Sequence, residues 1–121
     1  MMYSKAILFN DFEIANQILS TNNFRTIKAL GRRVSGFEDS IWDENKLNII
    51  YNGLYAKFSQ NLDLKNQLLN TNNKLLVECA VKDKIWASGM SMKDSDRFRP
   101  YLYSGTNYLG QLLMKVREDL R

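Results

Sequence analysis

Few side chains in this sequence could carry out covalent chemistry, because histidine is absent and cysteine occurs once. Without histidine there is no Ser–His or Cys–His dyad, and the commonest ligand of catalytic zinc is missing. The single cysteine, Cys79, excludes an internal disulfide and a thiolate metal cluster, and its apolar neighbours in KLLVECAV predict a small core residue. Any catalysis must therefore use carboxylates, amines, hydroxyls or amides, and we expect neither a metal nor another cofactor.

Lys5 is the first candidate, because it is the one charged residue in the opening stretch MMYSKAILF. At helical spacing its neighbours on the same side are Met1, Met2 and Phe9. A lysine in such surroundings either extends its ammonium group to water, which is the usual outcome, or has its charge destabilised by burial. Burial would leave a nucleophilic amine that can form a Schiff base with a sugar aldehyde.

Two further stretches, DKIWASG and LGRRVSGF, combine charge with a ring or a glycine turn. Asp83 precedes Trp86 by three residues, so its carboxylate could act as an acid or base beside a stacked ring, or could be an N-cap over a core tryptophan. Gly31 and Arg32 form a turn at a helix end, where an arginine fork suits phosphate or carboxylate. A plain helix C-cap explains Gly31 equally well.

The charge balance favours an anionic ligand without requiring one, since the net charge is +4 and the 17 Lys and Arg residues are dispersed. A denser basic group consists of Arg25, Lys28, Arg32 and Arg33. It could contact the phosphates of a nucleotide or of DNA, or it could be a solvated helix face. A nucleic-acid-binding helical domain is therefore an alternative that rests on charge alone.

The elements that must position these residues are mostly helical by their apolar periodicity and their stop signals. Helices are predicted over 1–9, 12–19, 25–30, 42–58, 63–69 and 107–120, with Phe12, Ile14, Ala15, Ile18 and Leu19 on one face of the second. The run LLVECAV predicts a short strand over 75–81, and turn-rich loops follow it. We therefore expect one compact α+β domain over 1–121, predominantly α-helical with a small amount of strand.

The composition, 45% hydrophobic and 25% charged over 121 residues, is typical of a soluble globular protein. No apolar run approaches the length that spans a bilayer, and the start shows no signal-peptide pattern. These features predict a cytoplasmic protein with no membrane partner. They do not indicate an oligomeric state.

Taken in order, six motifs resemble those of the NADAR, or YbiA-like, family over almost all of the chain. They are YSKAILF, KALGRRVSGF, the tryptophan Trp42, AKFSQN, LLNTNNKLLVECAVKDKIWASGM and GTNYLGQLLMKVREDL. The resemblance implies a hydrolase that cleaves the N-glycosidic bond of ribosylated nucleobase compounds. Its substrate would be a small-molecule nucleotide or an ADP-ribosylated nucleic acid, with ADP-ribosylated guanine and phosphoribosylamino riboflavin intermediates as examples.

The resemblance also assigns roles by position. Lys5 matches the family lysine proposed to attack the anomeric carbon of ribose and hold it as an imine, and Asp83 matches an active-site carboxylate. The positions that match substrate-binding residues of the family are Gly31, Arg32, Trp42, Lys57, Trp86, Gly89 and Asn107.

The chain departs from the family pattern in three places. Family members usually have an upstream segment with a catalytic glutamate seven residues before the lysine, and that position falls before Met1. Ala87 stands where the family has a glycine, and Leu102 and Tyr103 stand where it has a tryptophan. We therefore expect a NADAR-like domain without the usual upstream segment, with a catalytically impaired module that binds ADP-ribose or a nucleotide as the alternative to an active enzyme.

Overall fold

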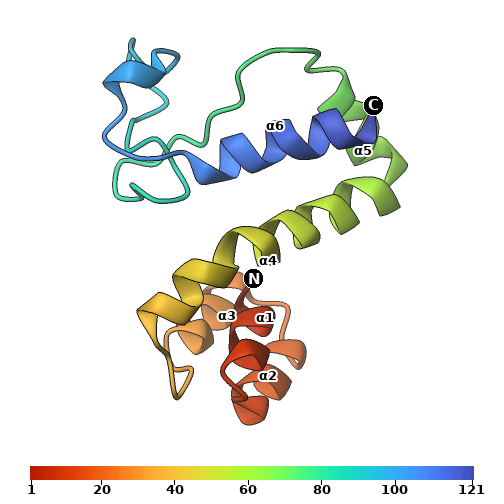
Figure 1. Cartoon of the computed structure of the whole chain (residues 1–121), viewed down its shortest axis with the longest axis vertical. Helices are drawn as coiled ribbons and strands as arrows, with labels where there is room; N and C mark the ends of the chain where they lie inside the picture. Colours follow the sequence, from red (N-terminus) through yellow and green to blue (C-terminus); the bar gives the residue numbers. More distant parts are fainter. The chain divides into compact units, whose positions relative to one another are not determined.

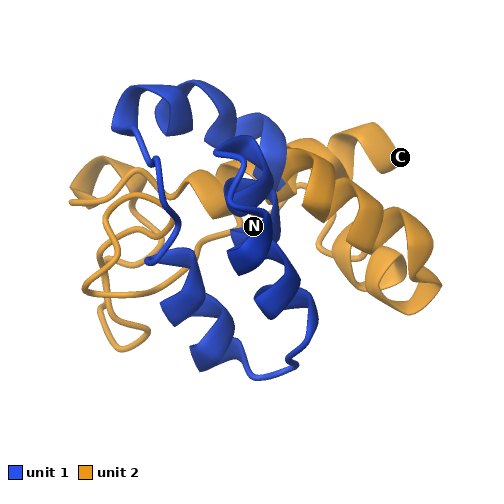
Figure 2. Ribbon diagram, turned by 90° about the horizontal axis from the view of Figure 1, so that it is seen from below, with its two compact units in different colours: residues 1–50 blue, residues 51–121 orange.

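The computed structural model describes residues 1–121 and divides into two compact units, Met1–Ile50 and Tyr51–Arg121 (Figure 2). The α-helices, labelled in Figure 1, are α1 (Met2–Leu8), α2 (Phe12–Leu19), α3 (Phe24–Gly31), α4 (Asp39–Gln60), α5 (Leu62–Leu69) and α6 (Tyr108–Leu120). A 3-10 turn, η1 (Pro100–Leu102), precedes α6. The boundary between the units falls within α4, the longest helix. None of the helices combines the length and apolar composition that crossing a bilayer requires.

The core of the first unit lies among α1, α2 and α3. Its buried residues are Ala6, Ile14, Ala15, Ile18, Leu30 and Val34, with Met2, Phe9 and Ile27 packed against them. Asp11 caps the start of α2, because its Oδ1 accepts a hydrogen bond from the backbone N–H of Ile14 at 3.1 Å. Its Oδ2 accepts from the backbone N–H of Ser35 at 2.9 Å, which joins the start of α2 to the segment after α3.

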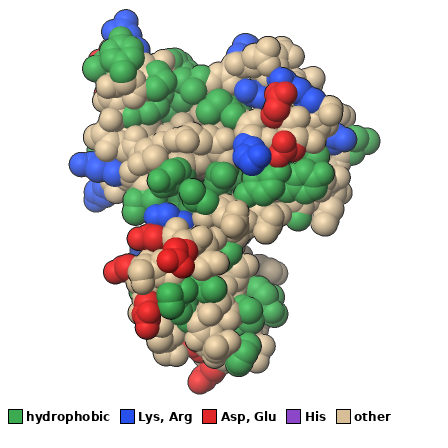
Figure 3. Space-filling view, viewed as in Figure 1, with side chains coloured by type: hydrophobic (Ala, Val, Ile, Leu, Met, Phe, Trp, Pro, Cys, Tyr) green, Lys and Arg blue, Asp and Glu red, His purple; other side chains and the backbone are tan.

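The helices predicted from periodicity are confirmed, but the predicted apolar face of α2 is partly wrong. Ile14, Ala15 and Ile18 are buried, whereas Phe12 is 58% and Leu19 is 66% exposed. A helix turns by about 100° per residue, so Phe12 and Leu19 lie beside Ala15 at the edge of the stripe, not at its centre. Large apolar side chains also reach the surface elsewhere, as Figure 3 shows for one face of the molecule.

The strand predicted over 75–81 is wrong, and so is the α+β class, because the structure contains helices and no β-sheet. The backbone of this segment finds its partners elsewhere. The N–H of Glu78 donates to Asn107 Oδ1 at 3.0 Å, and Asn107 Nδ2 donates to the carbonyl of Leu76 at 3.1 Å. Ser88 N–H donates to the carbonyl of Glu78 at 2.9 Å. A side chain and a turn thus take the place of a neighbouring strand.

The start of α6 packs closely on the same segment. Asn107, the N-cap residue of α6, is buried and has a left-handed backbone conformation with φ 54°. One turn later Gly110 is buried, and a Cβ atom there would lie 2.1 Å from the carbonyl oxygen of Leu76. The backbone of α6 can therefore approach Leu76 only because residue 110 has no side chain.

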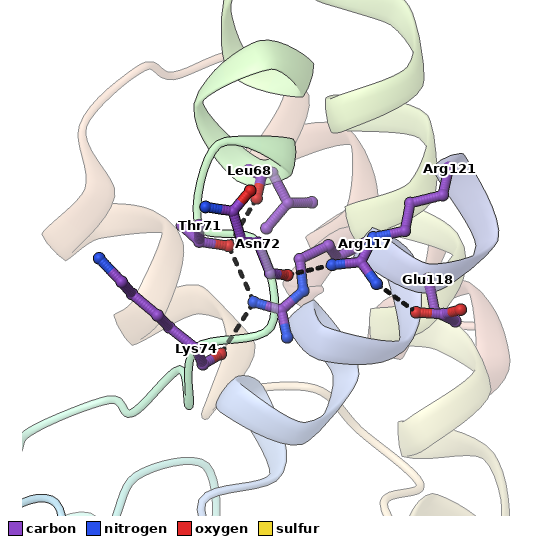
Figure 4. A network of polar contacts seen from close by, with 7 residues as sticks. All are labelled: Leu68, Thr71, Asn72, Lys74, Arg117, Glu118 and Arg121. Carbon is purple, nitrogen blue, oxygen red and sulfur yellow. Dashed lines mark hydrogen bonds and ion pairs between the residues drawn. The ribbon is translucent and has the colours of Figure 1, made fainter.

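The other end of α6 is joined to the turn after α5 by a polar network (Figure 4). The Arg117 side chain is buried and donates from Nη1 to Thr71 Oγ1 and to the carbonyl of Lys74, both at 2.8 Å. Arg121 adds a hydrogen bond to the carbonyl of Asn72. Because the partners of Arg117 are a hydroxyl and a backbone carbonyl, its buried guanidinium holds the turn in place without an ion pair.

We predict that Gly110→Ala lowers the free energy of unfolding by about 1–3 kcal/mol, because the added methyl overlaps the carbonyl of Leu76. Gly53→Ala in α4 is the matched control, since a Cβ there meets nothing within 4 Å. It should stabilise the chain by up to about 1 kcal/mol through helix propensity. Urea unfolding of both variants measures the difference, and equal changes would show that the close approach at residue 110 does not matter.

Candidate functional site

The amine of Lys5 lies at the C-terminal end of α3. Lys5 is partly buried, and its Nζ donates a hydrogen bond to the carbonyl of Gly31 at 2.8 Å. The last carbonyls of a helix lack partners within the helix and carry a partial negative charge, so a cation is well placed there. The side chain of Met2 fills the space beside Gly31, where a Cβ would lie 2.1 Å from Met2 Sδ. Two of the predicted site residues, Lys5 and Gly31, therefore meet within the first unit.

Two aromatic rings complete the surroundings of the amine. Lys5 Nζ lies 4.6 Å from the centroid of the Phe37 ring and 5.8 Å from that of Trp42, within the range of a cation–π interaction. Phe37 in turn contacts Phe9, with 5.2 Å between the ring centroids. The structure thus brings Trp42, a predicted binding residue, next to Lys5.

Burial lowers the pKa of Lys5, and the negative charge of Asp39 partly opposes this effect. A lowered pKa increases the fraction of neutral amine, the form that can act as a nucleophile. Asp39 is the first residue of α4 and precedes Trp42 by three residues, so both lie on the same side of the helix. Sequence reasoning missed Asp39 and Phe37, although Phe37 ends the quoted motif LGRRVSGF and offered that signal.

Arg32 directly follows Gly31 as the C-cap residue of α3 and is exposed. Arg25 and Lys28 are exposed as well, and the spacings of three and four place them on the same face of α3 as Arg32. None of these three side chains forms an ion pair within the chain. The structure therefore has a solvated basic face beginning beside the Lys5 amine, and its contact with phosphate remains a prediction.

In the second unit, Asp83 caps a turn. Its Oδ1 accepts hydrogen bonds from the backbone N–H of Ile85 at 3.0 Å and of Trp86 at 2.9 Å, so it caps this turn, although no helix follows directly and Trp86 is only partly buried. Oδ2 is free of hydrogen bonds within the chain, so a catalytic role for this carboxylate stays a prediction. The ring of Trp86 meets Tyr108 edge-on at 6.1 Å.

The other predicted binding residues of the second unit have mixed surroundings. Gly89 has φ +75°, and a Cβ there would lie 2.2 Å from Ser104 Oγ, so the turn requires glycine. The amide of Asn107 bonds to the backbone at residues 76 and 78, which gives it a structural role. Lys57 is exposed, with Nζ 5.6 Å from the ring of Phe58. Their contacts with substrate remain predictions.

An open groove of about 540 Å³ lies in the second unit and contains none of the predicted site residues. It is lined by Tyr51, Asn52, Tyr55, Ala56, Ser59, Gln60 and Asp119. The hydroxyl of Tyr51 donates to Asp119, and this bond raises the pKa of Tyr51 to about 12. The phenol therefore keeps its proton at neutral pH and offers no base.

Comparison with known proteins agrees with the motifs. The family model described as NADAR domain matches residues 1–121. An N-glycosidase of Acanthamoeba polyphaga mimivirus is 42% identical over 98% of this chain and 70% of its own length. The protein irg-1 of Caenorhabditis elegans is 37% identical over 98% of this chain and 57% of its own length. The chloroplastic riboflavin biosynthesis protein PYRR of Zea mays is 30% identical over 89% of this chain and 16% of its own length. The chain therefore belongs to the NADAR family.

Proposed function

We propose that this chain is an N-glycosidase that cleaves the bond between ribose and a nucleobase-type nitrogen through an imine on Lys5. The observation that carries the proposal is the partly buried Lys5 amine, held 2.8 Å from the carbonyl of Gly31 and faced by two rings. Its lowered pKa suits a nucleophile, and amine catalysis requires neither histidine nor metal. The name N-glycosidase of the mimivirus relative supports the same reaction class.

The proposed reaction consumes one water molecule. The bond between the anomeric carbon and the base nitrogen breaks, and the base leaves with a proton added to that nitrogen. The neutral amine of Lys5 bonds to the anomeric carbon and loses a proton, and the sugar ring opens as its ring oxygen gains one, leaving a protonated imine. Water then adds to the imine carbon, the amine leaves, and the free ribosyl product is released.

A carboxylate would assist the attack of water on the imine. Asp83 matches an active-site carboxylate of the family by position, and its Oδ2 has no hydrogen bond within the chain. Asp39 is a second carboxylate whose charge acts on Lys5. Replacing each by asparagine and comparing the release of product distinguishes them.

The basic face of α3 favours a substrate with a diphosphate or phosphate group, because arginine forks bind such groups in two-point contacts. ADP-ribosylated guanine, as a nucleoside or in nucleic acid, has this feature. A phosphoribosylamino intermediate of riboflavin synthesis has it as well, and one relative is named a riboflavin biosynthesis protein. Both compounds are therefore substrates to test with the wild-type chain and with variants of Lys5 and Arg32.

We expect borohydride reduction in the presence of substrate to add a ribosyl mass to the wild-type chain and none to Lys5→Met. Methionine is apolar and of similar length, so it fills the space of the lysine without offering an amine. Lys82→Met is the matched control, because Lys82 is exposed, and it should be labelled like the wild type. Mass spectrometry of the intact chain and of its peptides measures the adduct, and equal labelling of Lys5→Met would reject the imine.

We also expect Arg32→Ala to raise the KM for a diphosphate-bearing substrate about tenfold while kcat changes little, because the lost contact binds substrate and transition state alike. Lys93→Ala, at an exposed position of the second unit, should leave KM unchanged. Product analysis by chromatography with both substrate classes gives the constants. If calorimetry shows that ADP-ribose binds but neither substrate class gives product, the enzyme proposal is wrong and the chain is a nucleotide-binding module.

A further inference from the structure

We propose that Phe37 is a positioning residue for Lys5, whose ring face, together with the carbonyl of Gly31, fixes the direction of Nζ and stabilises a positive charge on it. The direction and charge of Nζ are properties of the free protein. The consequence of Phe37 for catalysis rests on the proposed imine chemistry.

The distances single out Phe37 among the neighbours of the amine. An ammonium group has three N–H bonds, and the carbonyl of Gly31 accepts one of them at 2.8 Å. The Phe37 centroid lies 4.6 Å from Nζ, nearer than the Trp42 centroid at 5.8 Å. The lysine side chain has several rotatable bonds, so with one hydrogen bond alone Nζ could adopt several positions. A ring face as the second contact restricts it to one direction.

The ring is itself held while part of it stays accessible. Phe37 packs against Phe9 with 5.2 Å between centroids and an angle of 58° between the ring planes. It is nevertheless 39% exposed. Phe37 is thus anchored on Phe9 while part of its ring borders solvent near the amine of Lys5.

The same contacts suit the covalent intermediate. A protonated imine at Nζ keeps the positive charge of the ammonium form and keeps one N–H. That N–H can donate to Gly31 as the ammonium does, and the charge stays beside the negative face of the ring. Phe37 would therefore stabilise both cationic states of this nitrogen and not the neutral amine.

The first unit carries other charged groups, among them the α-amino group of Met1, Asp11, Arg33 and Glu38. Asp39, on α4, raises the pKa of Lys5, and burial lowers it more strongly. The basic side chains of α3, Arg25, Lys28 and Arg32, are exposed, as is Glu13 on α2. Removal of the ring leaves all of these groups in place, so its effect on the amine can be separated from theirs.

The test uses Phe37→Leu and Phe37→Met, with Phe37→Tyr to restore the ring and Phe24→Leu as the control. Phe24 is 86% exposed, so its replacement should not change the labelling midpoint of Lys5. Acetic anhydride labels the neutral amine, and peptide mass spectrometry follows Lys5 labelling in the full chain from about pH 6 to 11. Helix content by circular dichroism confirms that each variant is folded.

Loss of the ring should shift the labelling midpoint of Lys5 down by roughly half to one pH unit, so labelling near pH 7 becomes three- to tenfold faster. Phe37→Tyr and Phe24→Leu should match the wild type. A merely structural role gives the opposite sign, because a loosened site exposes the amine to water and moves the midpoint up. An unchanged or raised midpoint in both folded variants would overturn the proposal.

Borohydride trapping with substrate is the second measurement. Phe37→Leu and Phe37→Met should accumulate several-fold less reduced adduct than the wild type, although their free amine is more reactive, and Phe37→Tyr should recover it. Undiminished adduct in both variants would contradict the proposed stabilisation. Absence of any adduct in the wild type would reject the imine function instead, while the labelling midpoints, measured without substrate, still decide the role of Phe37.

Discussion

The hydrogen bond from Lys5 Nζ to the carbonyl of Gly31 is the contact that places the amine within the first unit. A helix end leaves carbonyls without partners, and a buried carbonyl without a donor is costly. Lys5 supplies that donor from α1, so α1 and α3 are joined at this point. The contact also fixes where the amine lies relative to Phe37 and Trp42, so the feature that completes the helix end also forms the candidate reactive site.

In the second unit, which has no sheet, polar side chains supply hydrogen-bond partners to the backbone. The amide of Asn107 bonds to the backbone at residues 76 and 78, and the buried Arg117 bonds to the turn after α5. Asp83 does the same for its own turn. Polar residues of the family motifs therefore include organisers of irregular backbone, and a motif position is not by itself a sign of contact with substrate. This distinction concentrates the functional argument on Lys5 and its neighbours.

The sequence predicts the helices well because their apolar periodicity and caps are local signals. Local signals could not decide whether residues 75–81 form a strand, because an apolar run becomes a strand only when a partner strand exists. Here the side chain of Asn107 binds the backbone of this segment instead. Lys5 was identifiable as a lone charge in an apolar stretch. Phe37 ends the motif LGRRVSGF, but neither its proximity nor that of Asp39 to Lys5 could be read from the sequence, because both depend on how the segment after α3 leads into α4.

The first unit holds Lys5 at the end of α3 as an amine with a lowered pKa. The most direct measurement is an NMR titration of the lysine side chains in the full wild-type chain, with Lys5→Arg used to assign the Lys5 signal. The titration midpoint of Lys5 should lie clearly below those of exposed lysines such as Lys82 and Lys93. A midpoint for Lys5 within the range of the exposed lysines would contradict this account.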